Sequence, residues 1–172
     1  MTSIAPGMFL VASSSLDGDD CFGRSVILLV DVSEQGILGL NMAGPARDYW
    51  WNHVGGPMES PFWLLSKADA KTQSQALGDS GYCAECLYEA TTAAEAVPLV
   101  ASQLLMHQKT SMVMSGYAGW SPPQLEREVG LGFWRVASLS IDRLLSVAAE
   151  QRWAQANWAL NEAAHAAAGA AA

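Results

Sequence analysis

The chain has little positive charge. Its 172 residues include nine Lys and Arg against seventeen Asp and Glu, which gives a formal net charge of −8 at pH 7. The basic residues are also spread along the chain instead of being clustered. Nucleic-acid phosphates and anionic lipid headgroups are bound by clustered positive charge, so we expect neither direct nucleic-acid binding nor membrane binding.

Long apolar runs and a basic leader are also missing. No stretch reaches the roughly 18 unbroken apolar residues of a membrane span. The first fifteen residues, MTSIAPGMFLVASSS, contain no Lys or Arg and so lack the basic region of a secretion signal. Cysteine is scarce, with three in the chain. This odd count without an export signal predicts reduced thiols and a cytoplasmic location.

The residues that are present describe a globular chain. Hydrophobic residues make up 51% and charged residues 15% of it, which is enough apolar material for one buried core. We expect a single domain over residues 1–162. The alanine-rich tail, residues 163–172, has little to bury and is expected to be loosely held.

Short apolar runs between turn residues predict most of the strands. The polar turn at 33–36 predicts a hairpin, with Gly36 at a position of positive φ. Residues 43–61 are rich in Gly and Pro and predict an irregular connection. The predicted strands are residues 8–12, 25–32, 37–42, 62–65, 82–90, 110–116 and 132–138.

Two regions predict helices. In residues 91–108, Thr92 and Glu95 have capping-box spacing, and Pro98 is expected to kink or restart the helix. The chain is again helix-forming from Ile141 to its end. Strands and helices are mixed without regular βαβ alternation. We therefore predict an α+β domain with a curved, largely antiparallel sheet or barrel-like β core, flanking helices and a C-terminal helical region.

The most patterned stretch is GYAGWSPPQLEREVG, residues 116–130. A strand is expected to end at Ser115, turn through the glycines and enter a short helix. Ser121 and Gln124 form a capping box for this helix, and Gly130 is a natural stop. The two prolines after Ser121 remove amides from the first turn, so a phosphate-binding turn is disfavoured.

No other motif assembles a reaction centre. Cys83 and Cys86 lead into a predicted strand instead of starting a helix, and no second pair completes a zinc site. We therefore predict two ordinary thiols, no metal, no cofactor and no catalytic residue. Trp50 and Trp51 fall in the predicted loop and are candidates for a partner surface.

The pattern GYAGW..QLE.E, followed by Trp134, resembles the hallmark of the YqgE/AlgH family of bacterial proteins. Further segments are similar to family segments in the same order and extend the resemblance over nearly the whole chain. These segments are PG.FLVA at residues 6–12, F.RSVILL at 22–29, G.LGL at 36–40, GGP at 55–57 and EQRW at 150–153.

The resemblance implies an α+β domain with a barrel-like, curved sheet. One branch of the family carries the label of transcriptional regulator of alginate production, and the family as a whole has no established reaction, cofactor or catalytic residue. This chain departs from the family pattern in four places. The segment before GGP is shortened, and Thr91-Thr92-Ala93 stands where Thr-Thr-Ser is usual. The basic residue that usually follows Asn41 is missing, and Ser66 stands where a histidine is usual.

Our leading hypothesis is a non-enzymatic cytoplasmic regulatory or protein-interaction protein, with another protein as its partner. The alternative is a small-ligand-binding protein or enzyme, whose pocket would join Arg24, Asn41, Gln124 and the Gly116–Trp120 turn. The tentative ligand- or partner-binding residues are Arg24, Ser25, Asn41, Gly56, Tyr117, Trp120 and Gln124.

Arg24 is the side chain of this set that can bind a carboxylate through two parallel hydrogen bonds. We expect it to form a structural ion pair with Glu126, since buried charges are normally paired. Replacing Arg24 with Ala should then harm folding more than any binding function.

Overall fold

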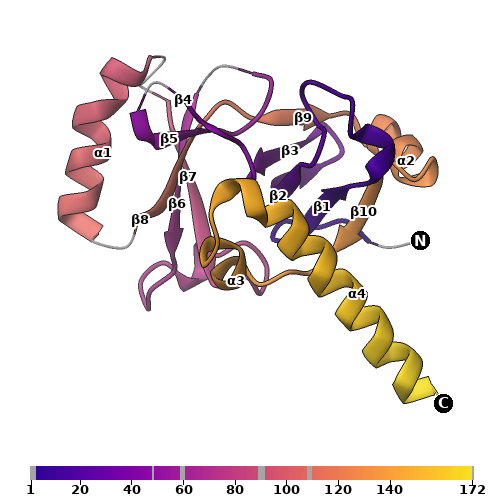
Figure 1. Ribbon diagram of the computed structural model, residues 1–172. Helices are drawn as coiled ribbons and strands as arrows, with labels where there is room; N and C mark the ends of the chain where they lie inside the picture. The colour runs from indigo at the N-terminus through magenta and orange to yellow at the C-terminus, as the bar shows by residue number, and fades with distance from the viewer. Residues whose placement is uncertain (1–2, 48, 59–60, 89–91, 108–109, 172) are drawn as a thin grey trace.

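The computed structural model describes residues 3–47, 49–58, 61–88, 92–107 and 110–171. Their strands form two five-stranded sheets, which lie side by side in Figure 1. The chain is thus an α+β protein, as the sequence predicts. The described strands close no barrel, which corrects the barrel-like alternative.

Sheet A has the strand order β10-β1-β2-β3-β9. All of its neighbouring strands are antiparallel, and β2 and β3 form the predicted hairpin. Gly36 is not among the positive-φ glycines, so the hairpin closes without that conformation. Its strands are β1 (Phe9–Ala12), β2 (Val26–Ser33), β3 (Gly36–Asn41), β9 (Ala118–Trp120) and β10 (Trp134–Ala137).

Sheet B has the order β4-β5-β8-β6-β7 and is mixed. Its strands β5 and β8 are parallel, whereas the other pairs are antiparallel. Residues 43–61, predicted to be irregular, therefore contribute two strands to this sheet. Its strands are β4 (Ala46–Arg47), β5 (Tyr49–Val54), β6 (Phe62–Lys67), β7 (Tyr82–Leu87) and β8 (Thr110–Ser115).

In the part of the chain that the structure describes, four α-helices accompany the sheets: α1 (Ala93–His107), α2 (Pro122–Gly130), α3 (Ile141–Leu145) and α4 (Arg152–Ala171). Pro98 lies inside α1 without ending it. The Thr92 hydroxyl accepts a hydrogen bond from the Glu95 amide at 3.2 Å, as the capping spacing predicts.

Helix α2 begins as predicted and ends at the predicted residue, Gly130, although the glycine with positive φ comes two residues later. The Ser121 hydroxyl accepts from the Gln124 amide at 3.3 Å. Gly130 remains helical, and Gly132 takes the positive φ of 82°. The amides of Gly132 and Phe133 donate back to Val129 and Glu128, which is the hydrogen-bond pattern of a glycine helix stop.

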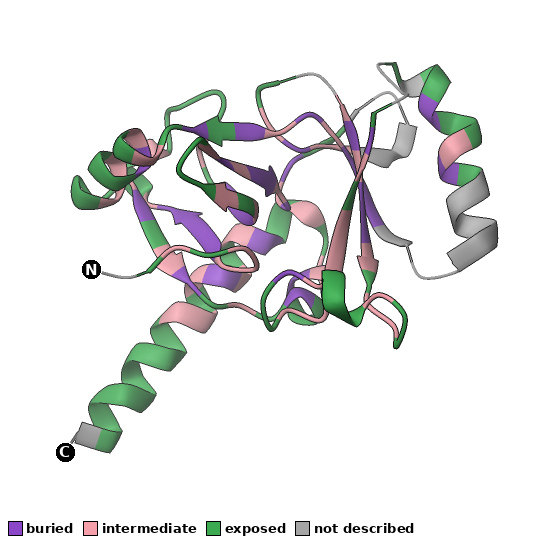
Figure 2. Cartoon of the chain, turned by 180° about the vertical axis from the view of Figure 1, so that it is seen from behind, coloured by how far each residue is buried: buried purple, intermediate pink, exposed green. Residues whose placement is uncertain are grey.

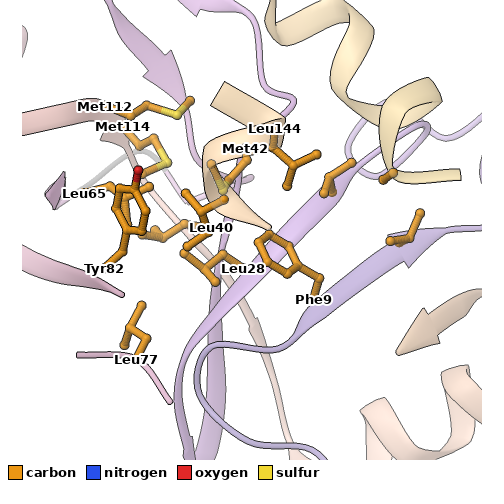
Figure 3. Packing of buried hydrophobic residues seen from close by; sticks show 14 residues of the cluster. Phe9, Leu28, Leu40, Met42, Leu65, Leu77, Tyr82, Met112, Met114 and Leu144 are labelled. Carbon is orange, nitrogen blue, oxygen red and sulfur yellow. The ribbon is translucent and has the colours of Figure 1, made fainter. Parts of the chain in front are cut away.

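The main core lies between the sheets and beneath α3 and α4. Figure 3 shows Phe9, Leu28 and Leu40 of sheet A facing Leu65 and Tyr82 of sheet B. Alternate residues of β1, Leu10 and Ala12, belong instead to a second cluster with α2. Both faces of sheet A are therefore covered, which explains why β1 is an unbroken apolar run.

The C-terminal region is not one continuous α-helix. After α3, a 3₁₀ turn at Ala149–Gln151 leads directly into α4. Residues 161–170 of α4 are all exposed, and Figures 1 and 2 show this end projecting from the body. The loose tail remains a prediction.

Candidate functional site

Two family-like segments meet where the sheets join. The Gly55 amide donates to the Ser115 carbonyl at 2.7 Å, and the Met58 amide donates to the Tyr117 carbonyl at 3.2 Å. The Asn41 amide in turn donates to the Gly55 carbonyl at 2.8 Å. The segments around GGP and GYAGW therefore form one backbone junction between β3, β5 and β8.

Gly56 is required at this junction for steric reasons. A Cβ atom at this position would overlap the carbonyl group of Tyr117 and lie too close to the Ala118 amide nitrogen. Both neighbours are backbone atoms and cannot rotate away. The tentative site residue Gly56 thus has a structural role in this fold.

A second group of motif residues is built around Glu128. Its carboxylate accepts hydrogen bonds from the indole nitrogens of Trp120 at 2.8 Å and Trp134 at 3.1 Å. Gln124 donates to the other carboxylate oxygen at 3.3 Å. Phe22 packs against both indole rings, with centroids 6.0 and 5.6 Å away. The QLE.E pattern therefore fastens α2 to sheet A.

Asn41 and Ser25 also hold backbone in place. The Asn41 side-chain oxygen accepts from the amides of Val26 at 3.2 Å and Ala43 at 3.0 Å. The Ser25 hydroxyl, 1% exposed, donates to the Phe22 carbonyl at 2.7 Å. These bonds fix the loop before β2 to the turn after β3.

Arg24 does not pair with Glu126, which corrects the sequence-based expectation. The residue is exposed, and its guanidinium lies over the Trp153 ring, 5.3 Å from the centroid. Its φ of 57° is the one positive value among the non-glycine residues that the structure describes. Because the Arg24 charge is not buried, it needs no carboxylate partner. Its guanidinium contacts the Trp153 ring of α4 instead.

Arg24, Asn41 and Gln124 therefore serve three separate contacts. Tyr117 and Trp120 do share a shallow cavity of about 330 Å³ beside the β2–β3 hairpin. This cavity also contacts Gly36 and Asp31. The Gly116–Trp120 turn is thus partly open to solvent, while the polar side chains of the alternative hypothesis do not converge on it.

A different arginine, Arg152, is the residue that sequence reasoning did not select. It is 8% exposed, and its Nε donates to the Leu144 carbonyl at 2.9 Å. Its Nη1 donates to the Met42 carbonyl at 2.8 Å. Burial lowers the pKa of this guanidinium, and the nearby charge of Glu150 opposes that effect. The family-like segment EQRW marks this position in the sequence, but the neighbouring residues do not indicate that its arginine is buried.

Arg152 lines a cavity of about 460 Å³ at the start of the C-terminal helical run. The wall opposite comes from the chain after β3 and from His53 of β5. The His53 Nδ1 lies 3.2 Å from the Gly44 carbonyl. The remaining lining residues are Ala43, Pro45, Ala46, Ala148, Ala149 and Glu150.

Cys83 and Cys86 line a third cavity, of about 640 Å³, on the edge strand β7. Burial raises the pKa of the Cys86 thiol, and a hydrogen bond with Tyr88 partly offsets this. A raised pKa favours the neutral thiol, which is the opposite of an activated cysteine. Across the described ranges, no three His, Cys, Asp or Glu residues are grouped to hold a metal ion.

Trp50 and Trp51, the candidates for a partner surface, belong to β5 by their backbone. Their side chains lie outside the described part of the structure.

These observations define a class of protein. It is an α+β fold in which glycine contacts join the two sheets, and a half-buried glutamate of helix α2 hydrogen bonds to tryptophans of sheet A. The chain belongs to the AlgH-like family, whose model matches residues 9–164. A UPF0301 protein from Anaeromyxobacter sp. strain K is 31% identical over 180 residues, covering 87% of this chain and 84% of the relative. A UPF0301 protein from Myxococcus xanthus is 27% identical and covers 89% of this chain and 88% of its own.

Solved structures support the fold. The solution structure of the AlgH protein from Pseudomonas aeruginosa matches with a TM-score of 0.60 at 22% identity, covering 91% of this chain and 90% of that one. The crystal structure of protein DIP2367 from Corynebacterium diphtheriae also gives 0.60, at 25% identity, with 79% and 76% covered. Within the described residues, no helix has the length and apolar character to cross a membrane.

Proposed function

We propose that this AlgH-like protein is a non-enzymatic cytoplasmic regulatory protein that acts by binding another protein. The observation that supports this is the use of the motif side chains. Gln124, Glu128, Asn41 and Ser25 each hydrogen bond within the fold. A reaction centre needs a nucleophile, an acid or a base that converges with others on one substrate position. Each of these side chains instead forms hydrogen bonds that hold the fold, and these bonds lie at separate places.

A partner surface is available at one end of sheet B. Tyr88, 83% exposed, directly follows Leu87, which pairs with Phe62 across the β6–β7 ladder. Met58, 49% exposed, lies four residues before Phe62. Val97, 41% exposed, follows Ala96 of α1, which packs in the cluster of Phe62 and Leu87. We call Met58, Tyr88 and Val97 the sheet B rim.

The sheet B rim has the chemistry of a protein interface. Tyrosine and methionine are enriched in interface cores, and exposed large apolar side chains are those that a partner can cover with a gain in free energy. The net charge of −8 favours a partner with a basic surface and disfavours direct contact with nucleic acid. The label of regulator would then reflect action through a protein partner.

The test is partner capture from a homologous cell extract, with identification and reconstitution of the purified pair. Tyr88→Asp should weaken the reconstituted complex about tenfold or more, because a charge is placed in the interface. Leu131→Asp is the matched control: Leu131 is 63% exposed and directly follows α2, away from sheet B in the sequence. Equal binding by both variants would remove the sheet B rim from the proposal.

Two further measurements test the rest of the proposal. A mobility-shift assay should find no tight, salt-dependent duplex binding, and elemental analysis should find no stoichiometric zinc. Specific turnover in a broad hydrolase and transferase screen would overturn the non-enzymatic assignment.

A further inference from the structure

Arg152 is a buried positive charge whose observed contacts carry no negative charge. Its hydrogen-bond partners are the carbonyls of Leu144, Val147 and Met42 and the sulfur of Met112. No carboxylate among the described residues forms an ion pair with it. Arginine keeps its proton in proteins, and a buried charge is normally paired. The guanidinium is therefore held by neutral groups, and Glu150 acts on it as a nearby charge without forming an ion pair.

The second terminal nitrogen of Arg152, Nη2, has no hydrogen-bond partner within the described ranges. In those same ranges, the one fully enclosed side-chain nitrogen or oxygen without a partner is Trp63 Nε1. Nη2 is therefore not fully enclosed, and the residue that carries it lines the 460 Å³ cavity. This cavity is the open space beside an otherwise buried, positively charged side chain.

The neighbouring wall supplies more donors. Ala148 precedes the helical run of residues 149–171 and offers no side-chain cap. The amides of Ala149 and Glu150 have no partner among the described residues, and both residues line the cavity. First-turn amides point out of the helix start and carry partial positive charge. They stand beside the guanidinium in the same cavity.

His53 completes the polar wall. Since a carbonyl only accepts, the contact with Gly44 assigns the proton to Nδ1 and leaves Nε2 for other contacts. Glu150 is the one carboxylate lining this cavity, and its side chain is exposed. Its charge opposes an anion and is screened by solvent.

We propose that this cavity binds a small oxyanion, a phosphate or carboxylate group, on Arg152 Nη2 and the amides of Ala149 and Glu150. A volume of about 460 Å³ exceeds that of the anionic group alone and lies within the ordinary range of small-molecule sites. The ligand class is therefore a small phosphorylated or carboxylated molecule. The site is separate from the sheet B rim and does not depend on the proposed function.

The experiment is an NMR titration of the full chain with inorganic phosphate and, separately, with succinate, each at constant ionic strength against chloride. Saturable shifts of the Ala149 and Glu150 amide signals are expected with at least one of them. The tighter of the two identifies the class of anion. Absence of saturable shifts at these amides with both anions would overturn the proposal.

Matched variants locate the site without disturbing Arg152, whose carbonyl bonds hold the fold. Ala46 is exposed, lies on β4 opposite His53 and lines the cavity. Ala46→Glu should weaken binding about tenfold or more through charge repulsion. Ala46→Gln has nearly the same size and should stay within about twofold of the parent. Equal affinity of the two variants would show that the anion binds elsewhere.

Two further variants check the charge argument. Glu150→Gln removes the opposing carboxylate and should tighten binding. Arg24→Gln removes a positive charge that lies over Trp153, outside the cavity lining, and should leave the affinity unchanged. A loss of binding in Arg24→Gln would assign the anion to a different site.

Discussion

Sheet A and sheet B differ in how their strands find their neighbours. In sheet A every pair is antiparallel, and β1, β2 and β3 are adjacent both along the chain and in the sheet. In sheet B, β5 pairs in parallel with β8, far away in the sequence, and β8 lies between β5 and β6. Each sheet thus has two pairs of consecutive strands and two pairs of distant strands. In sheet A the distant strands β10 and β9 are added at the two edges, whereas in sheet B the distant strand β8 lies inside the sheet and joins β5 to β6.

The difference teaches what the family-like motifs do. The hallmark stretch passes from β8 of sheet B into β9 of sheet A and then into α2. It therefore links an inner strand of sheet B to an edge strand of sheet A. At that crossing Gly56 packs against the backbone of Tyr117, and Glu128 binds the indole of Trp120. Three substitutions test this division of roles, from the largest expected effect to the smallest.

Gly56→Ala should be the most damaging, because the added methyl overlaps the backbone of Tyr117 at the crossing. We expect a loss of about 3 kcal/mol or more in the free energy of unfolding, measured by urea denaturation. Gly130→Ala is the control, since a Cβ there has nothing within 4 Å and the residue ends α2. That variant should be neutral or slightly stabilised by helix propensity. Equal losses would mean that the crossing has no special steric demand.

Glu128→Ala should come second, because it leaves the indole nitrogens of Trp120 and Trp134 without their acceptor. A loss of about 2–3 kcal/mol is expected, with a change in tryptophan fluorescence from sheet A. Glu126→Ala removes an exposed carboxylate from the same helix and should stay within about 0.5 kcal/mol of the parent. If Glu128→Ala matched that control, the QLE.E pattern would need an explanation other than attachment of α2.

Substitutions of Arg24 should have the smallest effect on stability. Two of them separate the contribution of the backbone conformation from that of the side chain. Arg24→Ala loses the contact with Trp153 but keeps the positive φ, and we expect a loss of about 0.5–1 kcal/mol. Arg24→Gly also loses the contact, but glycine adopts this φ freely and should recover most of the difference. Thermal unfolding of the two variants measures this difference in stability. A folded Arg24→Ala protein that no longer captures a wild-type partner would instead make this arginine a binding residue.

Local patterns were sufficient for the elements whose partners lie nearby. The apolar run at 25–32, the turn after it and the next run predicted the β2–β3 hairpin. Ser121 and Gln124 likewise marked the start of α2, because a cap depends on residues within one turn. The AlgH-like family was also evident from the order of short motifs.

Patterns that depend on distant partners were misread. Residues 46–54 were predicted to be irregular because they lie within the Gly- and Pro-rich stretch 43–61. Strand β5 forms by pairing with the distant β8, and β4 by pairing with β5. Strand β9 is three residues long and exists because β3 offers its edge. The contact of Arg24 with Trp153, in place of an ion pair with Glu126, does not follow from composition, which does not tell which residues of α4 will lie beneath the arginine.

The sequence by itself determined the α+β class, the hairpin, the capped helix and the family, since each rests on the spacing of neighbouring residues. Only the tertiary structure decided what the motif residues do. It turned Gly56 into a steric necessity, collected two tryptophans on Glu128 and buried Arg152 beside a cavity. Those roles come from contacts between segments far apart in the chain. Burial, charge compensation and close backbone approach are properties of such contacts, so no single segment of the sequence predicts them.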